Sequence, residues 1–156
     1  MIVTKDLELR LVVEFPDIFR DYGGDMRTTC MHWGFSHDDG WFSLVRAYCQ
    51  KLEAVRRATG IATVARQVKE KWGALVFYQD RYYPAEMPDV EKKHWEGILD
   101  DLENQLSDES RSTCEVCGER GAARQKGHWH KTVCPPDAAL LGFSDPDQGE
   151  AEPHSP

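Results

Sequence analysis

The sequence has no long hydrophobic run. Its apolar stretches, such as those at residues 11–13 and 74–78, are at most five residues long, whereas a membrane-spanning helix needs about 20 apolar residues. A basic segment leading into a hydrophobic one is also missing near the first residue, so we expect no secretory signal. These two absences favour a protein that works in the cytoplasm and does not cross a membrane.

Familiar catalytic motifs are missing as well. The chain contains no Ser–His–Asp pattern, no glycine-rich phosphate loop and no HExxH helix, the arrangements that support acyl transfer, phosphoryl transfer and zinc-dependent proteolysis. We therefore expect no enzymatic activity and no small-molecule substrate.

Cysteine is scarce, and its number is odd. Five cysteines occur among 156 residues, too few and too irregular for a disulfide framework. Three of them, Cys114, Cys117 and Cys134, form a pattern typical of a metal site, which favours reduced thiols and hence a cytoplasmic setting.

The Cys-x-x-Cys-Gly motif at residues 114–118 indicates a zinc knuckle. Its tight turn directs two thiolates at one point, and Cys134 supplies a third ligand from a later strand. The fourth ligand has three candidates: Asp137 in a Cys-x-x-Asp spacing, His130 in a His-x-x-x-Cys spacing, and His128. We expect a structural Zn²⁺ ion, because knuckles of this type contribute mainly to folding.

Charge is distributed unevenly along the chain. The formal net charge is −8, yet residues 86–110 alone carry nine acidic and two basic side chains. Such a composition disfavours a general affinity for nucleic acid. A local basic patch remains an alternative, with these candidate contacts: Arg66, Lys69, Lys71, Arg124 and Lys126.

Hydrophobic periodicity predicts the secondary structure. Helices are expected at residues 4–15 and 41–58 and from residue 88 onwards, where apolar side chains recur at helical spacing. Alternating residues on both sides of Trp72-Gly73 predict a β-hairpin over residues 61–78. The expected fold is α+β, with helices packed on a small antiparallel sheet built from this hairpin, followed by a C-terminal zinc-ribbon-like module.

These patterns predict three segments along the chain. Residues 1–110 form the α+β core domain, residues 111–143 form the zinc-knuckle module, and residues 144–156 form a disordered acidic tail because they are rich in Pro, Gly, Asp and Glu.

Residues 29–41 are dense in side chains that can bind metals or transfer protons. Cys30, His32, His37, Asp38 and Asp39 fall within this short segment. A second metal site or an acid–base cluster is one interpretation. Helix capping, loop histidines and a buried cysteine explain the same residues without chemistry, and we favour that second interpretation.

Two signatures resemble a family of small, functionally uncharacterised phage and prophage proteins. They are the WGF…DGW pattern at residues 33–41 and the QVKEKWGALVFY hairpin at residues 67–78. Members of that family commonly end in a Cys-x-x-Cys-Gly, an aromatic strand and a second ligand pair. The resemblance covers roughly residues 5–140. Here the last ligand position falls on Asp137, and His32 and His37 stand in a loop where relatives often have cysteine.

The resemblance implies a non-enzymatic accessory protein that binds a macromolecule in the host cytoplasm. Because small acidic phage proteins often interfere with host machinery, the implied target is a host or phage protein complex, such as a CRISPR-type defence or nucleic-acid-processing complex. Two alternatives remain open: a zinc-ribbon protein that binds nucleic acid, and a metal-dependent enzyme that uses His32 and His37.

Overall fold

The computed structural model describes residues 4–146, which contain four α-helices and two antiparallel two-stranded sheets. The predicted mixture of helices packed on a small antiparallel sheet is confirmed. Residues 147–156, most of the predicted acidic tail, lie outside the described residues.

The central element is a long β-hairpin. Strand β1 (Ala62–Lys71) pairs with β2 (Ala74–Tyr82), with an irregularity at Arg66. Trp72 and Gly73 make the turn with φ values of 54° and 79°, as in the two-residue turn that matches strand twist. Such a turn usually begins with Asn or Gly, so Trp72 stands in a backbone conformation that disfavours its side chain.

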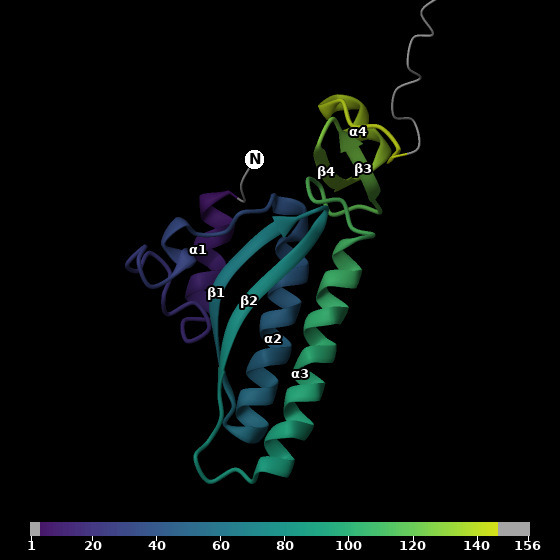
Figure 1. The fold of residues 1–156 in the computed structure, drawn as a ribbon. Coiled ribbons are helices and arrows are strands. Elements are labelled where there is room, and N and C mark those ends of the chain that lie inside the picture. Colours follow the sequence, from purple (N-terminus) through teal and green to yellow (C-terminus); the bar gives the residue numbers. More distant parts are fainter. Residues whose placement is uncertain (1–3, 147–156) are drawn as a thin grey trace, which may run out of the picture.

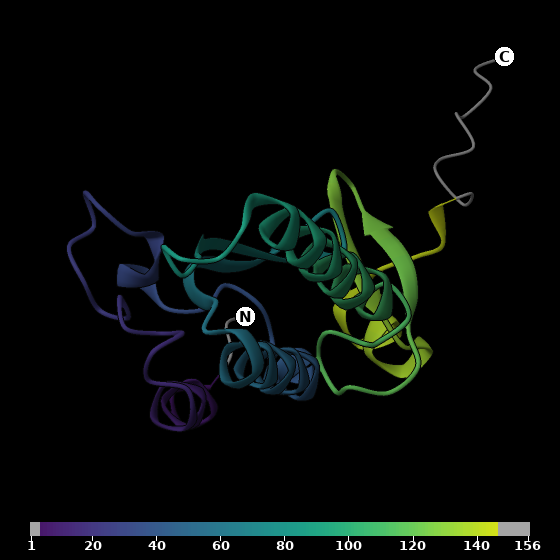
Figure 2. The ribbon, with the colours of Figure 1, turned by 90° about the horizontal axis from the view of Figure 1, so that it is seen from below.

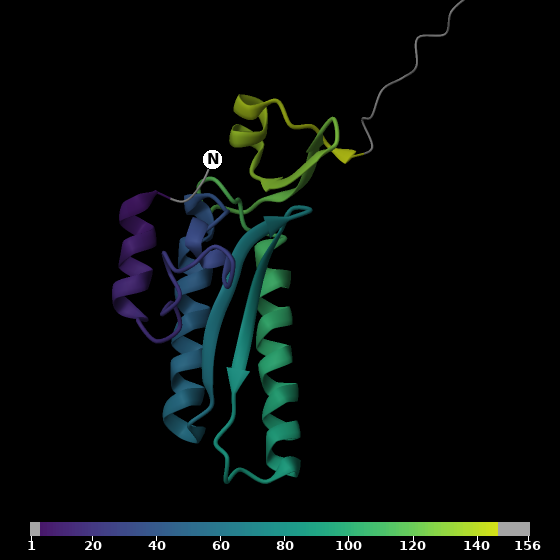
Figure 3. The ribbon, with the colours of Figure 1, turned by 60° about the vertical axis from the view of Figure 1, so that its left-hand side comes forward.

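Two helices run alongside this hairpin (Figures 1 and 3). Helix α2 (Phe42–Thr59) ends at Gly60, whose φ of 78° suits a left-handed cap. Helix α3 (Asp89–Ser110) packs against α2 and β2. Both helices bury an apolar stripe, made of Val45, Tyr48, Cys49, Leu52 and Val55 on α2 and Leu99 and Leu106 on α3.

Helix α1 (Lys5–Glu14) and residues 15–41 close the other side of the core. The connection contains two short 3₁₀ helices, η1 (Cys30–Trp33) and η2 (Asp39–Trp41). Buried Glu8 holds the two segments together, since its carboxylate accepts hydrogen bonds from Phe35 N (2.8 Å) and Tyr22 Oη (2.6 Å). In the described part of the chain, no helix is long and apolar enough to span a bilayer.

The C-terminal module (residues 111–146) lies at one end of the hairpin and of α3 (Figures 1 and 2). It contains a second hairpin, β3 (Ala122–Lys126) with β4 (Trp129–Val133), and helix α4 (Pro135–Leu141). Ser144 pairs with Gln125 on β3, so the segment predicted as a tail begins within this pairing.

The C-terminal module packs directly on the core. Gly40 N donates to Glu115 O (2.7 Å), and Thr132 Oγ1 donates to Gly73 O (2.6 Å). Contact at Gly40 is close, because a Cβ atom there would lie 2.2 Å from the carbonyl oxygen of Cys114. The docked position therefore requires glycine at residue 40.

Candidate metal centre

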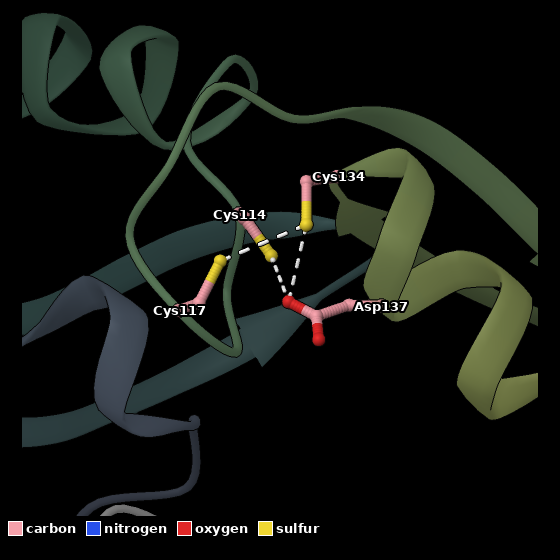
Figure 4. A group of neighbouring side chains, drawn as sticks. All are labelled: Cys114, Cys117, Cys134 and Asp137. Carbon is pink, nitrogen blue, oxygen red and sulfur yellow. Dashed lines mark hydrogen bonds between the residues drawn. The ribbon is translucent and has the colours of Figure 1, made fainter.

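Three cysteines and one aspartate converge in the C-terminal module. The Sγ atoms of Cys114, Cys117 and Cys134 and a carboxylate oxygen of Asp137 all lie within 4.8 Å of one another. Figure 4 shows the four side chains pointing toward a common centre. These atoms are close enough to hold a metal ion.

Cys114 and Cys117 lie in a tight turn, which the antiparallel bridge between Thr113 and Arg120 closes off. Gly118 N donates to Cys114 O (2.9 Å), which closes the turn, and Gly118 has a φ of 82°. This left-handed conformation suits glycine. The turn holds Cys114 and Cys117 on one side of the centre.

Cys134 and Asp137 come from the junction of β4 and α4. Cys134 caps the helix, and Pro135 and Pro136 occupy its first two positions, where the fixed φ of proline suits a helix start. Asp137 follows at the third position, and helical side chains lean toward the N-terminus. This tilt places Asp137 Oδ2 at 3.1 Å from Cys134 Sγ.

The carboxylate of Asp137 acts as the common acceptor of this group. Hydrogen bonds from the thiols of Cys117, Cys134 and Cys114 lower the pKa of Asp137. Conversely, the pKa of Cys117 rises to about 12. A backbone hydrogen bond from Glu119 lowers this pKa, but burial and the hydrogen bonds with Asp137 and the other two thiols raise it by more. A metal ion would replace the thiol protons that these hydrogen bonds use.

The two histidine candidates for the fourth ligand lie elsewhere. His130 is exposed on β4, where its ring packs against that of Trp72 with centroids 5.1 Å apart and an interplanar angle of 55°. His128 is exposed in the turn before β4. Among the three alternatives left open by the sequence, the structure brings Asp137 to the three cysteines.

A buried charge cluster joins the C-terminal module to the core. Lys131 Nζ lies 2.9 Å from Asp38 Oδ2 and 3.0 Å from Glu115 Oε2. Asp38 and Glu115 are 3% and 1% exposed. Burial raises the pKa of Glu115, although Lys131 acts in the opposite direction. We call Asp38, Glu115 and Lys131 the buried triad.

The two histidines of the 29–41 segment make contacts within the fold. His32 Nδ1 lies 2.5 Å from Gly24 O. His37 is 1% exposed and packs between Phe35 and Trp41, and its burial lowers its pKa. In residues 4–146, no second group of three or more such ligands converges.

Of the five predicted nucleic-acid contacts, three lie on β1 and two on β3, and two of the five are in ion pairs. Arg66 pairs with Asp80 and, at 2.6 Å, with Asp21. Arg124 pairs with Asp145 at 2.6 Å. Lys126 Nζ donates to the carbonyl of Leu141 at 2.9 Å, while Lys69 and Lys71 lie on β1 near the hairpin turn.

The sequence does not predict the ion pair between Glu115 and Lys131. Glu115 lies inside the Cys-x-x-Cys motif, between two metal-ligand candidates. The side chain of Lys131, on β4, is 16% exposed. A carboxylate within a tight knuckle turn was the one available signal.

Comparisons with known proteins give this chain no identified relatives. No protein-family model, no curated protein and no solved structure matches it.

Proposed function

We propose that the C-terminal module binds a structural Zn²⁺ ion through Cys114, Cys117, Cys134 and Asp137, and that the protein is a non-enzymatic binding protein. The observation that carries this proposal is the convergence of four ligand atoms within 4.8 Å of one another.

The separations suit a tetrahedral site. With Zn–S near 2.3 Å and Zn–O near 2.1 Å, tetrahedral angles place two sulfurs about 3.8 Å apart, and sulfur and oxygen about 3.6 Å apart. The Cys117–Cys134 sulfurs are 3.6 Å apart, and the sulfur–oxygen separations to Asp137 are 3.1 and 3.2 Å. A small outward shift of Asp137 accommodates the ion. Three thiolates favour Zn²⁺ over Mg²⁺ or Ca²⁺, which prefer oxygen ligands.

The site's composition supports a structural role. Four protein ligands complete a tetrahedron and leave no position for a reactive water, whereas catalytic zinc keeps one position open. The four ligands also close the chain between residues 114 and 137, joining the knuckle turn to α4. Zinc would therefore stabilise the folded module.

Zinc content tests this assignment and its fourth ligand. We expect the purified protein to hold one Zn²⁺ per chain, and Asp137→Ala to weaken zinc affinity by at least about tenfold, because a direct ligand matters no less than its outer partners. His130→Ala is the matched control and should retain wild-type zinc. Unchanged zinc in Asp137→Ala, or loss of zinc in His130→Ala, would contradict the proposed ligand set.

We further propose that the protein binds a macromolecular target, as its resemblance to phage and prophage accessory proteins implies, with a host defence or nucleic-acid-processing complex as the target class. The internal ion pairs of Arg66 and Arg124 favour a protein target over nucleic acid, because paired cations are poor phosphate ligands. A complex captured from host lysate should survive nuclease treatment. A complex lost on nuclease treatment would favour the nucleic-acid alternative.

A further inference from the structure

Cys117 is the exposed cysteine of the metal centre. Cys114 and Cys134 are buried, with 0% and 6% of their surface exposed, whereas Cys117 is exposed. The Sγ atom of Cys117 lies 3.6 Å from that of Cys134 (dashed line in Figure 4). A small oxidant in solution therefore reaches Cys117 before the other two cysteines, and a second sulfur lies beside the one that it attacks.

The chemical state of these sulfurs in a zinc site favours their oxidation. Zinc binds cysteine as the thiolate, which is also the form that reacts with oxidants. Oxidation converts a thiolate to a sulfenic acid, which condenses with a neighbouring sulfur to a disulfide. To form that bond, the sulfurs of Cys117 and Cys134 would approach from 3.6 Å to about 2.05 Å. The product would join the knuckle turn to the start of α4.

The carboxylate ligand makes the site sensitive to the loss of two thiolates. Once Cys117 and Cys134 are joined, one thiolate and one carboxylate remain, those of Cys114 and Asp137. A site of four cysteines would keep two thiolates after the same reaction. Because structural zinc sites use four protein ligands, the two that remain here are too few to hold the ion.

We propose that the metal centre is a redox switch, in which a peroxide joins Cys117 to Cys134 and the zinc ion leaves. The thiolate of Cys117 attacks one oxygen of hydrogen peroxide, the O–O bond breaks, and hydroxide departs as Cys117 becomes a sulfenic acid. The thiolate of Cys134 then attacks the sulfenic sulfur and displaces a second hydroxide. Two protons from the solvent convert both hydroxides to water. The two thiolates lose two electrons, which reduce the peroxide.

This inference rests on the proposed zinc site and concerns its regulation. The test adds hydrogen peroxide to the zinc-loaded full chain, follows zinc release with a chromogenic indicator, and maps disulfides by mass spectrometry. A glutamate-specific protease cuts after Glu115 and so separates Cys114 from Cys117 before mapping. We expect release of one Zn²⁺ per chain, in step with the Cys117–Cys134 disulfide, and recovery of zinc binding after dithiothreitol and zinc are added.

Three outcomes would overturn the proposal. The first is zinc that stays bound while Cys117 and Cys134 become joined. The second is zinc released while these two cysteines stay unlinked. The third is a disulfide between Cys114 and Cys117 as the main product.

Variants identify the thiol that reacts first. Cys117→His keeps a zinc-binding side chain and removes the exposed thiol, so peroxide-driven zinc release should slow by at least about tenfold. Cys30→Ser is the matched control, since Cys30 is also exposed but does not belong to the metal centre; it should release zinc at the wild-type rate. Equal rates for Cys117→His and wild type would contradict the reaction order. The disulfide map of the wild type decides the proposal even where Cys117→His binds no zinc.

Failure here differs from failure of the proposed function. A chain that holds zinc before peroxide is added, and keeps it afterwards, disproves only the redox switch. A chain that holds no zinc before the oxidant is added disproves the metal assignment itself.

Discussion

Replacing Lys131 with methionine tests whether the buried triad holds the C-terminal module on the core. The ammonium lies 2.9 and 3.0 Å from two carboxylates that are almost fully buried. At an effective dielectric constant of about 20, each contact corresponds to roughly 6 kcal/mol of Coulomb attraction. Desolvation of the ammonium offsets several kcal/mol of this sum.

Protonation of the carboxylates and entry of water limit the net loss further. We therefore expect Lys131→Met to lower the free energy of unfolding by about 3–5 kcal/mol, the range for removing one partner of a buried ion pair. With a denaturant slope of about 2 kcal/mol per molar urea, the unfolding midpoint should fall by about 1.5–2.5 M. Urea unfolding of the zinc-loaded protein, followed by circular dichroism, measures this shift.

Two comparisons separate charge from packing. Lys126→Met removes an ammonium that donates to a backbone carbonyl at the surface, and should cost less than about 1 kcal/mol. Adding Asp38→Asn and Glu115→Gln to Lys131→Met should recover part of the loss, because neutral amides no longer need a buried cation. If Lys131→Met costs less than about 1 kcal/mol, the buried triad does not stabilise the junction and the reasoning fails.

Two further predictions concern the same junction. Gly40→Ala should destabilise the protein by about 1–3 kcal/mol or more, because its Cβ would lie 2.2 and 2.5 Å from two backbone carbonyl oxygens. The control Gly97→Ala, with nothing within 4 Å of its Cβ, should stabilise α3 by about 0.5–1 kcal/mol. Equal effects of the two substitutions in urea unfolding would contradict the close contact at Gly40. Burial lowers the pKa of His37 in the folded protein. As the pH falls, His37 is therefore protonated in the unfolded chain before it is protonated in the folded one. The free energy of unfolding of the wild type should fall below about pH 6.5, by at most about 1.4 kcal/mol per pH unit. His37→Leu should lack that part of the loss, and parallel stability–pH curves for the two proteins would contradict it.

Local patterns explain why much of the core could be predicted. The hairpin follows from alternating apolar residues around Trp72-Gly73, and α2 follows from helical spacing ended by Gly60; both depend on neighbours in the sequence. The proximity of Cys114 and Cys117 was also predictable, because Cys-x-x-Cys spacing fixes its own turn geometry.

Contacts between distant residues could not be predicted in this way. Asp38 and Lys131 lie 93 positions apart and meet only because Gly40 lets the knuckle turn approach the core. Spacing also left Asp137 and His130 as alternatives for the metal. Helix α4 turns Asp137 toward Cys134, whereas the ring of His130 packs against that of Trp72 at an interplanar angle of 55°.

The four candidate metal ligands and two members of the buried triad lie on the same two segments of the chain. Glu115 lies between Cys114 and Cys117 in the knuckle turn, and Lys131 lies on β4, three residues before Cys134. The two segments that would close around a metal ion therefore also carry two members of the buried triad, Glu115 and Lys131. Because both segments are short and tightly bonded, an ion that fixes the cysteines also fixes the positions of Glu115 and Lys131.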